Sequence, residues 1–348
     1  MFEQRRYEFL LESEEPVAHH SESFGNSAIF MRRKVQLPDG TMVNRPTVTG
    51  DTMRHGLREA IVYVFLRAAG LLDAPALTEA ALRLLFAGGM LTGKGDGSAI
   101  KLDQYREMVD LVPPIRLLGG CAENRAIPGA FQVGDARLVC EEEMPFLPEW
   151  VHDWIADRAV HPARAHVEEV QRVRMDPTLN PGKRILLSDG ERARSEGRLL
   201  ASEAASAEGD ARARDDAKSS MMPRRVETVI QGSLWFWRTT ATVYTPLDVD
   251  TLDAMHAAFL ADCRVGGKKG TGHGLLRVAR RTVEEIVDGK RVPRTVYAAR
   301  NIDLHLPERR TTDAAGMVDP KATTGSILRA HVAERKERIV SLLTRVDA

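Results

Sequence analysis

The chain has 348 residues, 43% of them hydrophobic and 28% charged, which is enough apolar material for a sizeable core. Its 49 basic and 49 acidic residues argue against a protein that is basic all over but allow a local basic groove. Three cysteines without CxxC spacing are typical of a reduced, cytoplasmic protein. We see no signal-peptide pattern and no apolar run of membrane-spanning length, so we expect no membrane partner.

The first predicted strand covers residues 7–11, where large apolar side chains recur at every second position and indicate one buried face. Residues 19–44 follow as a hairpin or a long functional loop. This segment holds the pair His19-His20 and the basic run Arg32-Arg33-Lys34. A basic run can be a solvated face or part of a binding site, and the sequence leaves both interpretations open.

A helix is predicted to start at Thr49, Asp51 or Thr52, which are suitable N-caps, and to stop at Gly70. Its apolar stripe has helical spacing and consists of Met53, Leu57, Ile61, Val64, Phe65 and Ala68. Another face of the first two turns is basic and holds Arg54, His55 and Arg58. Because the dipole at a helix N-terminus disfavours cations, we interpret this cluster and Thr52 as a phosphate site. Ordinary exposed arginines are the alternative.

Two short helices are predicted over residues 78–87 and 103–111, within a helical insertion of residues 70–115. The first is expected to bury Leu82, Leu85 and Phe86, and Pro113-Pro114 is expected to stop the second. The loop Gly88–Gly95 between them nearly matches a Walker A motif. It lacks the Ser or Thr that would bind magnesium, and it follows a helix rather than a strand. We therefore interpret it as a surface loop and expect no cofactor.

Residues 129–140 predict strands with a bulge or turn at Gly134-Asp135. Residues 160–225 form a charged thumb or arm insertion, because residues 188–220 are rich in Ala, Ser, Arg, Glu and Asp and cannot supply much core. An arm that orders on a partner and plain disorder both fit this composition.

A strand or hairpin is predicted over residues 226–243, and a second helix starts at Pro246-Leu247-Asp248 and ends at Gly266-Gly267. Its apolar stripe is Leu252, Met255, Phe259 and Cys263. The glycine loop, residues 266–274, follows and has five glycines in nine residues. Glycine permits close approach of backbone to a ligand, successive N–H groups form an anion-binding concavity, and two lysines favour phosphate. The alternative is a Gly-rich turn with solvated lysines. The candidate ligand-binding residues are Gly267, Lys268, Lys269, Gly270, Thr271 and His273.

The chain then predicts a strand from Leu275, a hairpin turn at Asp288-Gly289, a strand pair or edge strand over residues 296–306 and a closing helix over residues 321–346. That helix uses Ile327, Leu328, Val332, Ile339 and Leu342 as its apolar face. The order strand, helix, strands, helix, strand indicates an α+β fold, with a ferredoxin-like (RRM-like) palm whose antiparallel sheet carries both principal helices on one face. We treat residues 1–348 as one domain.

With these elements placed, the chain resembles the backbone subunits of CRISPR–Cas effector complexes, which belong to the RAMP superfamily. The length, the large charged arm and the glycine loop make it most similar to the backbone subunit of type IV systems. The segments that carry the resemblance are residues 49–58, Leu117-Leu118-Gly119-Gly120 with Gly129-Ala130-Phe131, residues 173–177 continued by residues 227–233, and residues 266–274.

The resemblance implies that several copies assemble along one CRISPR guide RNA, together with other effector subunits. The guide then pairs with target DNA or RNA, so that base pairing supplies sequence specificity. It also implies that Met175, Met221 or Met222 on the arm is a wedge that interrupts the base stack. The implied RNA-binding residues besides these are Arg32, Arg33, Lys34, Thr52, Arg54, His55, Arg58, Gly267, Lys268, Lys269, Gly270, Thr271 and His273.

Related type III backbone subunits cut target RNA with an aspartate between the first strand and the first helix. Residues 19–34 contain no aspartate, so we expect a non-catalytic scaffold with no metal. One alternative is an endoribonuclease of the same superfamily that uses His19, His20 or His273 as acid or base. A nucleotide-binding or phosphate-transfer enzyme built on one of the two glycine-rich loops is a third hypothesis.

Overall fold

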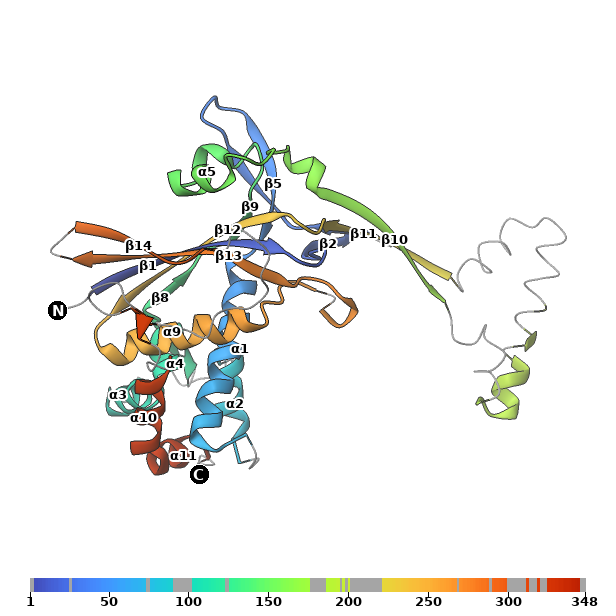
Figure 1. Ribbon diagram of the computed structural model, residues 1–348. Helices are drawn as coiled ribbons and strands as arrows, with labels where there is room; N and C mark the ends of the chain where they lie inside the picture. Colours follow the sequence, from blue (N-terminus) through green and yellow to red (C-terminus); the bar gives the residue numbers. More distant parts are fainter. Residues whose placement is uncertain are drawn as a thin grey trace.

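A computed structural model describes residues 3–24, 27–72, 76–89, 102–122, 125–175, 186–194, 196–197, 200, 221–267, 269–287, 290–298, 311–312, 318–319 and 324–344. The fold is α+β, as predicted, with helices gathered mainly on one side of a central sheet (Figure 1).

The central sheet has eight strands that pair antiparallel throughout. They are β1 (Glu3–Ser13), β4 (Arg32–Gln36), β5 (Met42–Val48), β8 (Phe131–Val133), β9 (Ala136–Leu138), β12 (Leu234–Val243), β13 (Leu276–Val287) and β14 (Lys290–Ala298). Their order is β14-β13-β1-β12-β9-β5-β4, and β8 also pairs with β12. Strands β8 and β9 both pair antiparallel with β12, at different positions along it. The chain therefore keeps its direction at Gly134-Asp135, which separates the two strands without forming a hairpin turn.

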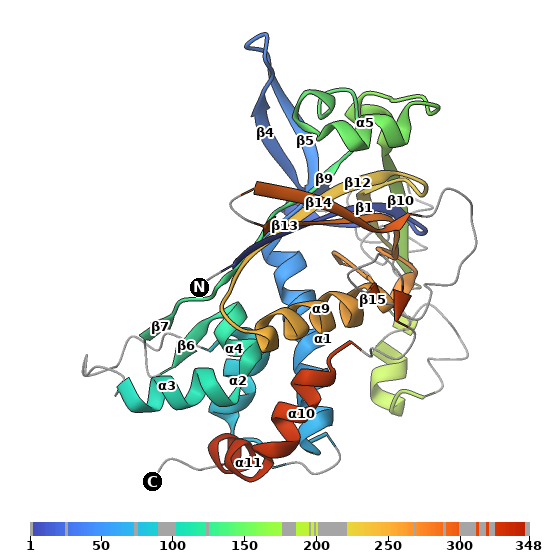
Figure 2. The ribbon, with the colours of Figure 1, turned by 60° about the vertical axis from the view of Figure 1, so that its left-hand side comes forward.

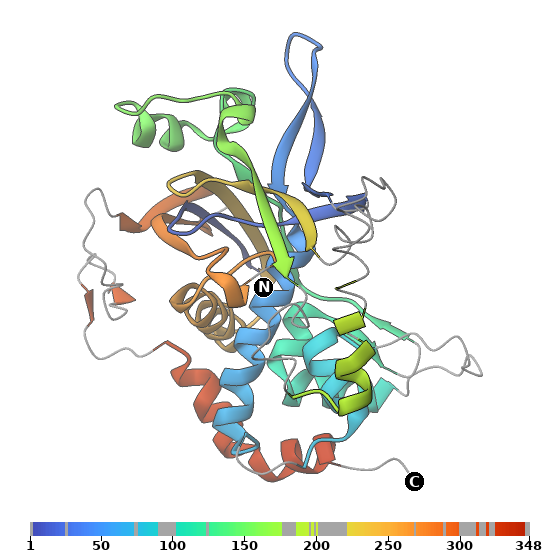
Figure 3. The same cartoon turned by 90° about the vertical axis from the view of Figure 1, so that its right-hand side faces the viewer.

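A second sheet carries the arm, which we define as the hairpin of β10 (Val167–Met175) and β11 (Met221–Val229) with the insertion between them. Strand β11 also pairs in parallel with β3 (Ser27–Phe30), which forms a hairpin with β2 (His20–Phe24). Figure 1 shows the β10–β11 hairpin extending away from the body of the molecule, and Figure 3 views the molecule from the side to which this hairpin points. The hairpin implied by the resemblance is present, but its strands are residues 167–175 and 221–229 rather than residues 173–177 and 227–233. Residues 176–185 and 201–220 lie outside the described part of the chain.

Helices α1 (Gly50–Ala69) and α9 (Pro246–Ala261) pack together against one face of the central sheet. Further helices gather beyond them: α2 (Glu79–Ala87), α3 (Leu102–Leu111), α4 (Pro113–Leu118), α10 (Ser326–Glu334) and α11 (Lys336–Thr344). Helix α5 (Glu149–Ile155) lies on the opposite face of the sheet, beside the projecting β4–β5 hairpin (Figure 2). The described residues also include the small elements β6 (Gly120–Ala122), β7 (Arg125–Ile127), β15 (Thr311–Thr312), β16 (Val318–Asp319) and the short turns η1 (Met144–Phe146), η2 (Ala163–His166) and η4 (Lys269–Thr271).

Strand β1 is buried on both faces, which corrects the expectation of one buried face. Tyr7 and Phe9 face the larger core between the sheet and helices α1 and α9. Leu10 points to the other side and joins a smaller cluster with Val151 of α5 and Phe236 of β12. The sequence pattern shows alternation, but it does not show that a later helix covers the second face.

The start of α1, its stop at Gly70 and the start of α9 are as predicted, whereas α9 ends at Ala261 with Asp262 as its C-cap, before the predicted stop at Gly266-Gly267. The side chain of Thr49 accepts a hydrogen bond from the Thr52 N–H, and Gly70 ends α1 in the left-handed conformation with φ +74°. A reciprocal capping box of Thr245 and Asp248 starts α9. These local signals therefore set where both helices begin.

Several boundaries differ from the predictions. Pro113 and Pro114 begin α4 instead of only ending α3, because proline is well tolerated in the first turn of a helix. The closing helix is broken at Arg335 into α10 and α11. Leu82 and Ile327 were expected in apolar stripes but are 47% and 45% exposed.

Candidate nucleic-acid interface

The ends of the glycine loop are held by close backbone contacts. The N–H of Val265 donates to the Gly274 carbonyl at 2.9 Å, and a Cβ at Gly274 would overlap the carbonyl oxygen of Val265. A Cβ at Gly266 would overlap the carbonyl oxygen of Ala18, and both glycines have positive φ. Glycine is therefore required at both ends by packing as well as by conformation.

The loop is also tied to the segment that follows β1. Gly267 N–H donates to the Ala18 carbonyl at 2.6 Å, and Gly274 N–H donates to the Pro16 carbonyl at 2.9 Å. Two of the N–H groups that were expected to face an anion are thus used within the protein. The Gly267 N–H is therefore not available as the predicted donor to phosphate. The remaining candidate contacts lie in the middle of the loop.

The middle of the loop faces outward. Lys269, Gly270 and Thr271 form the short turn η4 and are exposed, and a Cβ at Gly270 would meet nothing within 4 Å. His273 is only 5% exposed, and its Nδ1 lies 3.0 Å from the Thr271 carbonyl. His273 is therefore part of the loop's internal structure in this conformation, and Lys268 lies outside the described residues.

The first two turns of α1 pack against the last turn of α9, which precedes the glycine loop by a few residues. Gly56 on α1 approaches α9 so closely that a Cβ there would overlap the ring of Phe259 in the last turn of α9. The glycine loop begins a few residues after that turn, and His19 contacts both its Gly266 end and Thr49, the N-cap of α1. We call these two parts, the start of α1 and the glycine loop, the clamp.

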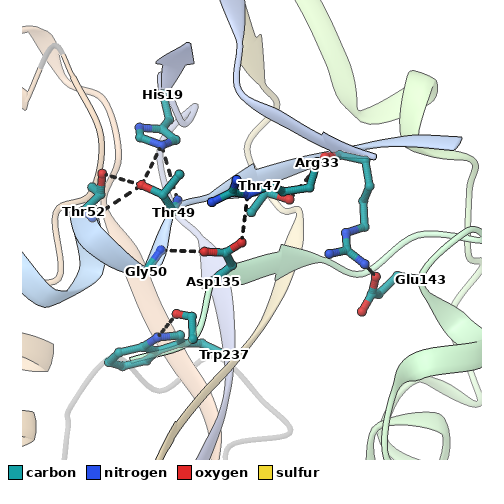
Figure 4. Close-up of polar contacts among 11 residues, drawn as sticks. His19, Arg33, Thr47, Thr49, Gly50, Thr52, Asp135, Glu143 and Trp237 are labelled. Carbon is teal, nitrogen blue, oxygen red and sulfur yellow. Dashed lines mark hydrogen bonds and ion pairs between the residues drawn. The ribbon is translucent and has the colours of Figure 1, made fainter. Parts of the chain in front are cut away.

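A carboxylate of the protein itself occupies the start of α1 (Figure 4). The Gly50 N–H donates to Asp135 Oδ1 at 2.7 Å, while the Nε of Arg33 donates to Asp135 Oδ2 at 3.2 Å. The Thr52 N–H donates to Thr49 Oγ1 at 3.4 Å. Asp135 had been assigned only to a turn, because nothing in its local sequence points to a helix 85 residues earlier in the chain.

The arginines of α1 have structural partners. Arg54 donates to the carbonyls of Phe131, at 3.0 Å, and Leu118. Arg58 donates to the carbonyls of Leu118 at 3.2 Å and Gly119 at 2.9 Å and is only 7% exposed. Burial, with a smaller contribution from Arg54, lowers the pKa of Arg58 to about 10.

These contacts explain why a basic cluster lies on α1. Leu118 is the last residue of α4, so its carbonyl belongs to the negative end of that helix. The guanidinium of Arg58 lies at this negative end of α4 and points away from the positive N-terminus of α1. The interpretation of Arg58 as a phosphate ligand is thus not supported by its position, whereas His55 on α1 is exposed and Thr52 is half-buried.

The basic run on β4 is partly neutralised. Arg32 pairs with Glu227 of β11 at 2.7 Å, and Arg33 pairs with Asp135, whereas Lys34 is exposed. Burial alone would raise the pKa of Glu227, but the bonds from Arg32 and the Phe30 N–H lower it. These pairs connect the β4–β5 hairpin to the arm and to α1.

The histidine pair lies where the arm meets the body. His19 Nε2 accepts a 3.3 Å hydrogen bond from the Thr49 N–H, and His20 Nε2 lies 3.1 Å from the Glu227 carbonyl. The arm methionines lie near the far end of the hairpin, where Met175 is the cross-strand partner of Met221. Met222 is opposite Arg174 in the same register.

Among the residues that the structure describes, no group of three or more His, Cys, Asp or Glu side chains is arranged to hold a metal ion. Within the same residues, no helix combines the length and the apolar character that crossing a membrane requires.

No family model matches the chain, and no curated protein matches it. Among solved structures, a chain of a structure described as a Type IV-B CRISPR Complex is similar, with a TM-score of 0.51 and 16% sequence identity. The similarity covers 80% of this chain and 90% of that chain. The two chains share a fold. The predicted resemblance to a type IV CRISPR subunit is thereby confirmed at the level of the fold.

Proposed function

We propose that this protein is a non-catalytic backbone subunit of a CRISPR effector complex of type IV, which binds guide RNA and assembles with further copies of itself along it. The observation that carries the proposal is the fold shared with a chain of the Type IV-B CRISPR Complex over most of both chains. Its partners would be the guide RNA, other effector subunits and the target nucleic acid, DNA or RNA, that pairs with the guide. A cytoplasmic location is part of the same proposal.

The sheet order supports a ferredoxin-like palm. The strands β13, β1, β12 and β9 are neighbours in this order and antiparallel. The helices α1 and α9 each precede a strand of this set and pack on one face. Such palms occur among RNA-recognition folds. Here α5 covers part of the opposite face of the sheet. We therefore assign the proposed RNA contacts to the clamp and the arm rather than to that face.

The proposed contacts to the RNA backbone are the exposed polar groups around the clamp. Phosphate contacts position a strand without reading its sequence, so they suit a protein that carries guides of many sequences. The arm methionines would then interrupt the base stack. The residues proposed for phosphate and ribose contact are Lys268, Lys269, Gly270, Thr271, Thr52, His55, Arg33 and Lys34.

The test is co-purification with a repeat-spacer RNA, followed by measurement of the absorbance ratio, the particle size and the affinity at several salt concentrations. We expect RNA-loaded oligomers whose affinity falls steeply with salt. Replacing Lys268 and Lys269 together by alanine should weaken RNA binding and leave the unfolding transition in place. A chain that remains an RNA-free monomer at low salt would sink the proposal.

The non-catalytic part of the proposal has its own test. A labelled guide precursor and a labelled target RNA should both remain intact after incubation with the protein. Cleavage that disappears in His19, His20 or His273 variants would instead establish an endoribonuclease.

A further inference from the structure

The segment between β1 and β2 contacts each part of the proposed site. Ala18 accepts the hydrogen bond from Gly267, and Val17 exchanges two backbone hydrogen bonds with Val229 at the base of the arm. The next residue, His19, accepts at its carbonyl oxygen from the Met31 N–H at 2.7 Å. The main chain of this segment therefore connects the glycine loop, the arm and the start of β4.

The side chain of His19 adds the remaining connection, to α1. Its Nε2 accepts from the Thr49 N–H at 3.3 Å and lies 3.3 Å from the Thr49 hydroxyl (Figure 4). Its Cβ lies beside the glycine loop, 3.4 Å from the point where a Cβ at Gly266 would stand. The half-buried side chain of His19 thus contacts both the N-cap of α1, through its ring, and the glycine loop, through its Cβ.

The ring nitrogen must be an acceptor for this contact to form. The Thr49 N–H can only donate, so Nε2 carries no proton and the neutral ring holds its proton on Nδ1. Burial, and after it the charge of His20, lowers the pKa of His19, while Asp135 acts in the opposite direction. A neutral ring near pH 7 agrees with the geometry.

We infer that His19 is a positioning residue for guide-RNA binding, which sets the distance between the two halves of the clamp through its Nε2 contact with Thr49. This inference rests on the proposed function. His19 does not itself need to touch RNA. Without the acceptor, the N-cap of α1 is no longer tied to the loop, and the phosphate-binding groups of the two halves lose their fixed separation.

The test compares two amides at position 19. In His19→Gln the amide oxygen extends about as far from the backbone as Nε2, whereas in His19→Asn it reaches only about as far as Nδ1. We expect the glutamine variant to bind guide RNA within about twofold of the wild type and the asparagine variant to lose about tenfold. Urea unfolding of both variants checks that they are folded. If the asparagine variant does not fold, His19→Leu, which lacks an acceptor, replaces it.

A double-mutant cycle separates positioning from a general loss of stability. If His19 acts by placing the glycine loop, the losses caused by His19→Asn and Lys269→Ala should be clearly less than multiplicative, because the first change already misplaces the lysine. Multiplicative losses, or equal RNA affinity of the glutamine and asparagine variants, would overturn the inference and leave the proposed function standing. A wild-type protein that binds no RNA would overturn the proposed function itself.

Discussion

Asp135 Oδ1 accepts a 2.7 Å hydrogen bond from the backbone N–H of Gly50, the first residue of α1. A carboxylate thus lies at the helix end where the sequence predicts a phosphate. The positive end of the helix dipole stabilises this carboxylate, and Arg33 pairs with its second oxygen. The start of α1 is therefore prepared as an anion site, but the protein fills part of it with its own side chain.

Changing Asp135 to asparagine should separate its contribution to stability at the start of α1 from its competition with phosphate for the same site. The amide keeps its shape and loses its charge, so we expect a loss of about 1 kcal/mol in the free energy of unfolding. Guide-RNA affinity should rise by a few fold, because one negative charge disappears beside the clamp and Arg33 loses its ionic partner. Asp39→Asn, at the tip of the β4–β5 hairpin, makes the same change in net charge as a control. Equal RNA affinity for both variants would show that Asp135 does not compete with phosphate.

Two glycines of the same loop should respond differently to alanine. Gly266→Ala meets the Ala18 carbonyl oxygen at a positive φ, so we expect about 2–4 kcal/mol of destabilisation in urea unfolding. Gly270→Ala meets open space and should change the free energy of unfolding by less than about 0.5 kcal/mol. Comparable unfolding midpoints for the two variants would contradict the close contact between Gly266 of the glycine loop and the Ala18 carbonyl after β1.

Arg58→Lys tests whether this arginine serves the fold or the RNA. Lysine keeps the charge but cannot reach the carbonyls of Leu118 and Gly119 with a planar fork, so we expect about 2 kcal/mol of lost stability. The salt dependence of RNA binding should stay unchanged. Arg67→Lys, at an exposed position of the same helix, should leave both quantities unchanged. A variant with normal stability and weakened RNA binding would restore Arg58 as a phosphate ligand.

Stability should decrease in mild acid. The pKa values of His19, His166 and His331 are lowered from 6.5, in each case mainly by burial. The unfolded chain therefore binds protons more readily than the folded chain, and stability rises with pH in this range. The contribution is complete above about pH 6.5 and is lost as the pH falls through the lower folded-state values. Urea midpoints measured from pH 7.5 to pH 5 should fall, and His19→Gln should reduce the fall. A midpoint that rises toward pH 5 would contradict this assignment.

The order of strands and helices could be predicted from local patterns. The N-cap residue Thr49, the stop at Gly70 and the start at Pro246 are short-range signals, and both helices begin where these signals place them, although α9 ends at Ala261 rather than at Gly266-Gly267. The resemblance predicted a hairpin at the base of the arm, and the structure has one with Met175 opposite Met221, although its strands are residues 167–175 and 221–229 rather than the predicted segments. Lys269, which composition alone indicated as a ligand-binding residue, is exposed, and its contact with RNA stays a prediction.

Partners that are distant in sequence could not be predicted. Arg58 reaches carbonyls 60 and 61 residues away, Asp135 reaches Gly50 across 85 residues, and His19 reaches Thr49 across 30. The identity of a residue determines which hydrogen bonds its side chain can make, but tertiary packing determines which partner it contacts. Arg54 and Arg58 were predicted to bind phosphate because the sequence does not show that both reach backbone carbonyls.

The sequence by itself determined the α+β class, the two capped helices, the glycine loop and the resemblance to a type IV CRISPR subunit, because these depend on periodicity, caps and residue types that act over a few positions. Only the tertiary structure decided how the clamp is built. The close approach of Gly56 to Phe259 and the bond from Thr49 to His19 bring the two halves together, and Asp135 occupies the anion site at the start of α1. These are contacts between segments far apart in the chain, and their geometry exists only once the core has formed.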